Sequence, residues 1–202
     1  MYPYTIREAV HSDLGRIMQL EIKVTFEFFH PLMASIYKYD FPTAPQNLAL
    51  HDVSNGLQKN VIAYEKVLIQ KQCDKRVIAA FNDVTHECIG MLYVTQRQNC
   101  IFLELLCLEK SHRNQGIGKQ LLEHAYKLFP TAEYCLATTH KHSSNNSAIT
   151  AYKKLGFDAH ECMPLEFDHI FSRIIVINHP NGNTYTRSTN GHVLFLVKKL
   201  HR

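Results

Sequence analysis

Two adjacent stretches decide the fold of this chain: Ile101-Phe102-Leu103-Glu104-Leu105-Leu106-Cys107-Leu108 and, after a short turn, Arg113-Asn114-Gln115-Gly116-Ile117-Gly118-Lys119. The first is apolar at nearly every position, which is typical of a central β-strand covered on both faces. Glu104 is its one exception. The second opens a helix that carries an apolar stripe and stops at Pro130. We therefore expect a buried strand, a glycine-containing loop and a helix in succession.

The loop between this strand and this helix has the features of an anion site. Free backbone N–H groups and the positive end of the helix converge there, and glycines let the backbone approach an anion closely. Arg113 and Lys119 add positive charge. Two known phosphate motifs do not fit. A P-loop needs Ser or Thr where Gln120 stands, and a dinucleotide fingerprint needs a third glycine where Leu121 stands. The loop is therefore predicted to bind phosphate in another way.

Outward from this loop, strands and helices alternate along the chain, with no internal repeat or polar linker. Ser12 is predicted to cap a helix that has Asp13 in its first turn. Residues 28–58 are irregular and rich in aromatic residues and proline. Strands are expected at residues 4–9, 76–81, 88–94, 101–108, 134–138, 174–177 and 192–197, and helices after Ser12, at residues 60–72, after Gly116 and between Asn145 and Gly156.

Length and composition indicate one packed domain, residues 1–202. Of the 202 residues, 46% are hydrophobic and 20% are charged, which excludes disorder as the main state. The 22 Lys and Arg residues against 18 Asp and Glu residues give a net charge of +4, too small for a dedicated nucleic-acid binder. No apolar run approaches the roughly 18 residues of a membrane span, and the first residues do not resemble a secretion signal. We expect neither a nucleic-acid partner nor a membrane association.

Cysteine and histidine usage adds two expectations. The six cysteines include no C-x-x-C pair, and several lie in apolar strands, which favours a reducing, cytoplasmic location. Of the 13 histidines, His140 and His142 form the one close pair that could share a strand face, and no further ligand is spaced to complete a metal shell. No metal site is predicted.

Three motifs in a fixed order carry a family resemblance. Leu106-Cys107-Leu108 is followed by Arg113-x-x-Gly116-x-Gly118 and then by Asn145-x-x-Ala148-x-x-x-Tyr152-x-Lys154-x-Gly156-Phe157. This succession resembles the GNAT superfamily of N-acetyltransferases. The resemblance implies a single α/β domain whose mixed, mostly antiparallel sheet has about seven strands, is splayed in the middle and is flanked by helices on both faces. It also implies a cofactor-binding core at residues 88–157, with residues 28–75 and 158–202 as walls of the acceptor site.

The resemblance further implies acetyl-CoA as the cofactor and assigns residues to it. The loop amides would bind the pyrophosphate, and the strand backbone would pair with the pantetheine arm. Asn145 would contact that arm, and capping its own helix is the other role open to it. Tyr152 would give a proton to the departing CoA thiolate, and a place in the apolar core is its other role. The predicted cofactor-binding residues are Leu106, Cys107, Leu108, Arg113, Asn114, Gln115, Gly116, Ile117, Gly118, Lys119, Asn145 and Tyr152.

Transfer to an amine also needs a proton acceptor, because a lysine-like amine has a pKa of about 10.4 and is mostly protonated near neutral pH. Glu104 is the predicted base, since a carboxylate in an apolar strand is partly desolvated, which raises its pKa. Some family members carry a glutamate at the matching place. Strand alternation puts Glu104 on one face with Leu106 and Leu108, opposite Cys107, whose apolar setting disfavours a thiolate nucleophile. An ion pair with Arg or Lys is the alternative role for Glu104.

Together these features predict an acyltransferase: an acetyl-CoA-dependent N-acetyltransferase that moves the acetyl group to a primary amine by direct attack in a ternary complex. Glu104 and Tyr152 are the predicted catalytic residues. A non-catalytic acyl-CoA-binding sensor is the alternative function, because the cofactor loop can persist without an effective base. Fold and family select neither a small molecule nor a peptide as acceptor, and they allow a homodimer.

Overall fold

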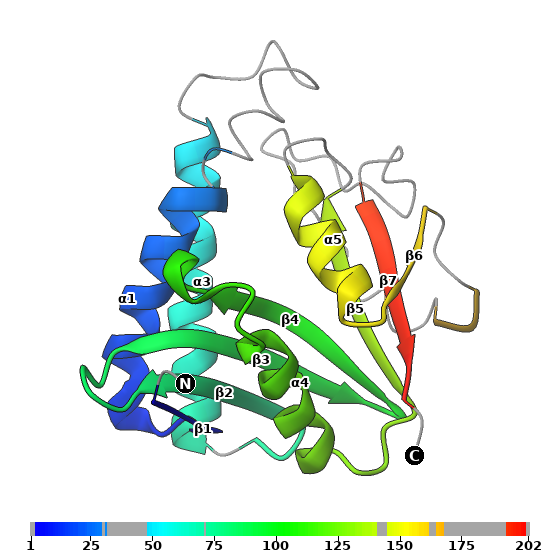
Figure 1. Ribbon diagram of the computed structural model, residues 1–202, viewed down its shortest axis with the longest axis horizontal. Helices are drawn as coiled ribbons and strands as arrows, with labels where there is room; N and C mark the ends of the chain where they lie inside the picture. Colours follow the sequence, from blue (N-terminus) through cyan, green and yellow to red (C-terminus); the bar gives the residue numbers. More distant parts are fainter. Residues whose placement is uncertain are drawn as a thin grey trace.

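One seven-stranded sheet organises the chain (Figure 1). The computed structural model describes residues 3–29, 31, 48–70, 72–140, 145–161, 165–167 and 193–200. The strands are β1 (Tyr4–Glu8), β2 (Lys75–Asn82), β3 (Cys88–Arg97), β4 (Cys100–Leu108), β5 (Tyr134–His140), β6 (Asp158–His160) and β7 (Val193–Lys199). The α-helices are α1 (Leu14–Val24), α3 (Leu48–Gln70), α4 (Ile117–Leu128) and α5 (Asn146–Lys154). Short helical turns are η1 (His11–Asp13), η2 (Thr25–Phe29), η3 (Lys110–His112) and η5 (Leu165–Phe167).

The strand order is β1-β2-β3-β4-β5-β7-β6, and every neighbouring pair is antiparallel except β4 and β5, which are parallel. This confirms the expected mixed, mostly antiparallel sheet. The parallel pair requires a crossover, which α4 provides between the two strands. The predicted strand–loop–helix succession is therefore the link that joins the two halves of the sheet.

β4 and β5 separate halfway along their length. Their pairing covers only Cys100 to Leu103 on β4, opposite Tyr134 to Ala137 on β5, and beyond it the two strands diverge in Figure 1. The expectation of a strand covered throughout is therefore wrong for its second half, in which Leu105, Leu106 and Leu108 are half-buried. We call residues 104–108 of β4 the open edge, because no strand of the described residues pairs with the side that faces away from β3.

A β-bulge starts the open edge. Tyr93 on β3 pairs with Leu105, but the next residue, Val94, pairs with Leu103, so Glu104 is the extra residue on β4. A bulge changes which face the following side chains occupy. Glu104 contacts Thr95 on the face that also carries Cys107, whereas Leu106 and Leu108 pack on the opposite face. The expected grouping of Glu104 with Leu106 and Leu108 is therefore wrong.

Two helical layers cover the sheet, as expected. α4 and α5 pack on one face, where Ile117, Leu121 and Leu122 join a continuous apolar cluster with the central strands. α1 and α3 pack on the other face, where Ile17 and Tyr64 join a second cluster. A third, smaller cluster lies on that second face beneath β5 and β7 and includes Phe102, Phe167 and Phe195. Burial of these side chains is the main contribution that holds the layers together.

Several expected elements are displaced. Ser12 does not cap α1; it lies inside η1, and the buried Asp13 carboxylate accepts the Val10 N–H instead. α3 starts at Leu48, twelve positions before its expected start, and it continues through residues 54–56, whose low helix propensity predicted a later start. β6 was not expected, because a strand of three residues leaves no periodic pattern. The expected strand at residues 174–177 lies outside the described residues.

Candidate acetyl-CoA site

The loop before α4 is built to expose backbone amides. Asn114 and Gly116 have positive φ angles of 61° and 84°, and Gly116 is the N-cap residue that precedes α4. A Cβ added at Gly116 would meet only Gln120 Nε2, at 3.9 Å, so the space beside this backbone is open. The N–H groups in the first turn of a helix have no partner within the helix. The loop therefore presents free donors and the positive end of α4 to that open space, as an anion site requires.

Side chains fix this loop to the end of β4. Arg113 Nε donates to the carbonyl of Leu108 at 3.1 Å, and Gln115 Nε2 donates to the carbonyl of Ser111 at 2.9 Å. The Glu109 carboxylate pairs with Lys23 of α1 and with His112 Nδ1. Arg113 thus holds the loop as well as adding charge. Lys119 is exposed and lies 3.8 Å from Glu123, which leaves it free to move toward a ligand.

The open edge of β4 runs from Glu104 to this loop. Leu106, Cys107 and Leu108 pair with β3 on one side, and on the other side no strand in the described part of the chain pairs with them. An extended chain of amides can add to such an unpaired edge by backbone hydrogen bonds. The Cys107 side chain points into the cluster beneath α1 and α3, where burial raises the pKa of its thiol far above the ordinary value. Cys107 can therefore offer a ligand only its backbone groups, and its thiol stays protonated at neutral pH.

Glu104 lies at the other end of the open edge. Thr95 Oγ1 donates to Glu104 Oε1 at 3.0 Å, and Arg97 Nη2 lies 3.8 Å from the same oxygen. The Glu104 side chain is 26% exposed. Burial raises its pKa, and the Thr95 hydrogen bond and the charges of Arg97 and Lys75 offset only part of that rise. A carboxylate with a raised pKa that keeps access to solvent suits a general base.

Tyr152 lies in α5, and Asn145 lies at the start of this helix. The Tyr152 ring packs edge-on against Phe157, with centroids 5.4 Å apart. Burial raises the pKa of the Tyr152 hydroxyl, with smaller contributions from the thiols of Cys107 and Cys135, so the hydroxyl is protonated and can donate. Asn145 is 2% exposed and donates its amide N–H to Thr139 Oγ1 at 2.8 Å; it stands at the cap position of α5 without a side-chain cap bond.

Two partners of Glu104 were not singled out from the sequence. Thr95 and Arg97 lie beyond Val94, where the expected strand ended, whereas β3 continues to Arg97. The signal that could have found them is the alternation of Met91, Tyr93, Thr95 and Arg97, which places a hydroxyl and a guanidinium in line with two apolar side chains.

Within residues 3–29, 31, 48–70, 72–140, 145–161, 165–167 and 193–200, no three His, Cys, Asp or Glu side chains gather as metal ligands would. In the same ranges, no helix combines the length and the apolar character that crossing a membrane requires.

Comparisons with known proteins agree with this geometry. Peptidyl-lysine N-acetyltransferase YjaB of Salmonella typhimurium is 35% identical over 71 residues, which are 35% of this chain and 43% of that protein, so the chain matches less than half of the relative's length. The structure of PaiA N-acetyltransferase from Thermoplasma acidophilum, in complex with coenzyme A, superposes with a TM-score of 0.63 at 18% identity, covering 98% of this chain and 99% of that one. The structure of an acetyltransferase from Thermus thermophilus superposes with a TM-score of 0.54 at 16% identity, covering 98% of this chain and 97% of that one.

The two solved structures share the fold of this chain, and the family model gives the relationship itself. The model of the acetyltransferase (GNAT) family matches residues 33–157, which is more than half of the chain. That range contains the open edge of β4, the loop before α4 and the start of α5 through Phe157. The protein therefore belongs to the acetyltransferase (GNAT) family.

Proposed function

We propose that this protein is an N-acetyltransferase that transfers the acetyl group of acetyl-CoA to a primary amine by direct attack in a ternary complex. The observation that carries the proposal is the open edge of β4, which has Glu104 at one end and the amide-rich loop at the other. A cofactor with a pyrophosphate and an amide-containing arm matches this pair of features. Acetyl-CoA is such a cofactor, and PaiA carries coenzyme A in its structure.

Different residues bind different parts of acetyl-CoA in this proposal. The amides of residues 114–119 hold the pyrophosphate, and Arg113 supports that loop from the Leu108 carbonyl. The backbone of Leu106, Cys107 and Leu108 pairs with the pantetheine arm. Asn145 borders the arm from the start of α5. In this arrangement the thioester lies at the Glu104 end of the open edge.

Two protein groups, Glu104 and Tyr152, carry the protons in the proposed reaction. The amine nitrogen attacks the thioester carbonyl carbon, and its proton goes to Glu104. The tetrahedral intermediate then collapses, the C–S bond breaks, and the sulfur takes the proton of the Tyr152 hydroxyl. Exchange with water then removes the proton from Glu104 and returns one to Tyr152, so both groups are ready for the next turnover. No acyl-enzyme is needed, and the protonated, buried thiol of Cys107 is unsuited to form one.

Acetyl-CoA binding is tested by calorimetry on two matched glycine variants. Gly116 and Gly156 both have left-handed backbones, with φ of 84° and 86°, so replacement by alanine strains each by a similar amount. Only Gly116 borders the proposed pyrophosphate site. We expect Gly116→Ala to weaken acetyl-CoA binding by about tenfold. Gly156→Ala should keep wild-type affinity, and equal affinities in all three proteins would contradict the proposed site.

The transfer step is tested by release of the CoA thiol with a panel of amines. The name of the Salmonella relative makes a lysine peptide with a blocked N-terminus the first acceptor to assay. Glu104→Gln should lower kcat/KM by about 10²- to 10⁴-fold, because a neutral amide cannot take the proton. Tight acetyl-CoA binding without thiol release on any amine would instead support the non-catalytic sensor.

A further inference from the structure

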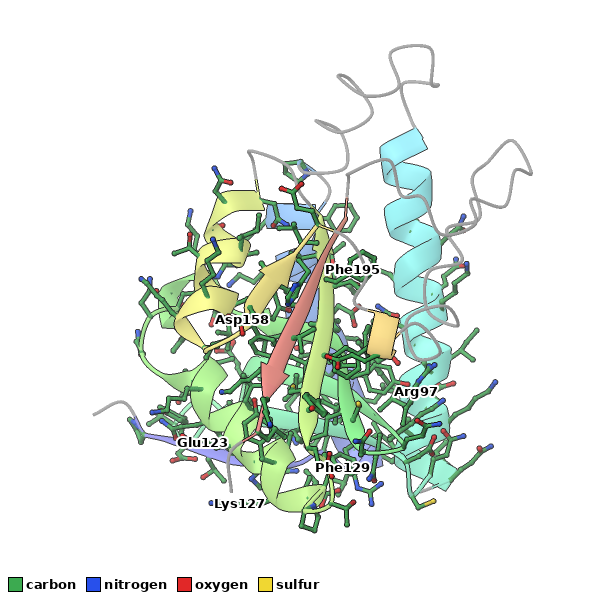
Figure 2. The ribbon with its side chains drawn as sticks, turned by 90° about the vertical axis from the view of Figure 1, so that its right-hand side faces the viewer. Arg97, Glu123, Lys127, Phe129, Asp158 and Phe195 are labelled. Carbon is green, nitrogen blue, oxygen red and sulfur yellow. The ribbon has the colours of Figure 1, made fainter. Side chains whose placement is uncertain are left out.

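The sheet face beneath α1, α3 and η5 contains a polar interruption. One apolar cluster on this face includes Tyr93 and Cys107, and the other includes Cys100 and Phe102. Between them lie Thr95, Arg97 and Glu104, which we call the polar seam. Figure 2 shows Arg97 on the side of the sheet where α3 and η5 lie, opposite Glu123 of α4. Polar groups between two apolar clusters lower the free energy that burial of the apolar surface contributes to folding. A role other than stability is therefore expected for the polar seam.

Thr95 is the buried member of the seam. It is 2% exposed, and its hydroxyl donates to Glu104 Oε1. Arg97, whose side chain is 30% exposed, directs Nη2 to the same oxygen. Neither contact involves Oε2, and the structure gives Oε2 no other hydrogen bond within the described residues. The two oxygens of Glu104 are therefore distinct, one held by β3 and one left for another partner.

The bulge sets Glu104 apart from its neighbours on β4. Glu104 lies on the face of Thr95, which pairs with Phe102, two positions before Glu104 on β4. As the extra residue, Glu104 has no pair on β3, and the bulge moves Leu105 to this face and Leu106 to the α4 face. The carboxylate is thus held by the two side chains at the end of β3, apart from the residues that pack beneath α4.

We propose that Thr95 and Arg97 are positioning residues that hold Oε1 of Glu104, so that Oε2 faces the acceptor amine. This inference rests on the proposed role of Glu104 as the base. A base must bring a lone pair within about 2.6–3.2 Å of the proton it removes, and a carboxylate fixed by one oxygen samples fewer unproductive rotamers. Thr95 and Arg97 act through Glu104 and need not touch the acceptor.

The proposal also predicts a direction for pH dependence. Among the described residues, the charged and titratable groups that face the carboxylate are Lys75 at the start of β2 and Tyr93 and Arg97 on β3. Asp74, just before β2, faces Tyr93. Thr95 and Arg97 both favour the ionised form of Glu104. Removing either raises the Glu104 pKa, so a larger share of the carboxylate is protonated near neutral pH. The acidic limb of the kcat/KM profile must then move to higher pH.

The experiment compares Thr95→Val, which has the same shape without the hydroxyl, with Thr95→Ser, which keeps it. The acidic limb should move up by about one pH unit in Thr95→Val, and Thr95→Ser should stay near the wild type. The assay uses acetyl-CoA and the lysine peptide that carries one free amine. Thr85→Val is the matched control, because Thr85 also donates to a glutamate, Glu87, but in the exposed β2–β3 turn. Should Thr95→Val fail to fold, Arg97→Gln tests the same shift.

A second readout does not depend on turnover. The Glu104 carboxyl is titrated directly by NMR in wild-type, Thr95→Val and Thr85→Val proteins labelled with ¹³C-glutamate. A Glu104 pKa that rises in Thr95→Val alone supports the inference. An unchanged Glu104 pKa, or an equal rise in the Thr85→Val control, overturns it. If Glu104→Gln retains full activity while the NMR titration moves as expected, the proposed base is wrong although Thr95 still holds the carboxylate.

Discussion

The two faces of the sheet differ in how their apolar surface is arranged. Beneath α4 and α5, one continuous cluster extends from β2 to β7. Beneath α1, α3 and η5, the apolar surface is divided into two clusters by the polar seam of Thr95, Arg97 and Glu104, and a further carboxylate, Glu21, is buried beneath α1. We call the face beneath α4 and α5 the filled face and the opposite face the divided face. Burying the polar groups of the divided face costs free energy unless they are paired.

In the proposed function, the two faces have separate tasks. The α4 face carries the loop and the open edge on a rigid support, because Leu108 packs between Gly90 and Gly118 on that side. The opposite face presents Glu104, which must change its protonation state in the proposed reaction. Rigid packing suits a backbone site for a cofactor, and a partly hydrated carboxylate suits proton transfer. Substitutions on the two faces should therefore differ in kind.

The largest stability effect is expected at Gly90 on the filled face. A Cβ there would lie 2.7 Å from Leu108 Cδ2 and 3.2 Å from Ile117 Cγ2, so Gly90→Ala must displace Leu108. Overpacking of this kind costs about 2 kcal/mol of unfolding free energy, which urea denaturation measures. Gly15→Ala in α1 is the control: it meets nothing within 4 Å and should keep or raise stability. Equal stabilities for the two variants would show that the filled face has spare volume.

The filled face was also the more predictable one. The glycine loop, its helix and the order of the motifs follow from local chemistry, since an apolar strand, an αL glycine and a 3.6-residue stripe each leave a sequence pattern. Gly116 has the left-handed backbone that an amide-presenting loop needs. Sequence alone could not show that Arg113 supports the loop through the Leu108 carbonyl, because that contact depends on how the chain turns after η3.

The divided face was less predictable for physical reasons. A bulge adds one residue without changing composition, so the alternation of β4 predicts the wrong face for Glu104 relative to Leu106. The partners of Glu104 come from a neighbouring strand, and strand register is a long-range property. The start of α1 was missed in a similar way: Ser12 fits the pattern of a cap, but Asp13 stands at the cap position without a side-chain cap bond, and its carboxylate pairs with Arg7 and Arg16.

A smaller effect is expected from Asp13, which anchors the edge of the divided face. Burial alone would raise its pKa, but hydrogen bonds from Arg7 and the Val10 N–H, with the nearby charge of Arg16, lower it below the ordinary value. Asp13→Asn should therefore lose about 1.5 kcal/mol at pH 7. Because the folded-state pKa is lowered, the wild-type advantage is present above pH 4 and is lost as the pH falls through the folded pKa.

The measurement is urea unfolding of Asp13→Asn and wild type at pH 7 and near pH 3. Asp83→Asn is the control, since Asp83 is an exposed carboxylate that accepts from Thr5 on the neighbouring strand. Its effect should stay within about 0.5 kcal/mol. If Asp13→Asn loses as much unfolding free energy near pH 3 as at pH 7, the shape of the Asp13 side chain, and not its charge, stabilises the fold.

The smallest effect, and the one of opposite sign, is expected at Glu21 within the divided face. Burial raises its pKa, and Asn60 and the nearby Tyr64 hydroxyl offset only part of the rise. Asn60 donates to Oε1, but Oε2 and the Tyr64 hydroxyl have no hydrogen-bond partner among the described residues. The folded state therefore holds the proton more tightly than the unfolded chain does. Stability is greatest below the ordinary glutamate value and falls as the pH rises toward the folded pKa.

Glu21→Gln should thus stabilise the protein by about 1 kcal/mol at pH 8 and by nearly nothing at pH 4. The amide keeps the acceptor for Asn60 and adds a donor beside the Tyr64 oxygen, so it fits the site without a charge. Thermal unfolding at the two pH values measures the gain, with the exposed Glu65→Gln in α3 as the control. A Glu21→Gln variant that is less stable at pH 8 would show that the buried carboxylate is satisfied. The expected gain would show that this face retains a charged group at a cost in stability, as a face used for function does.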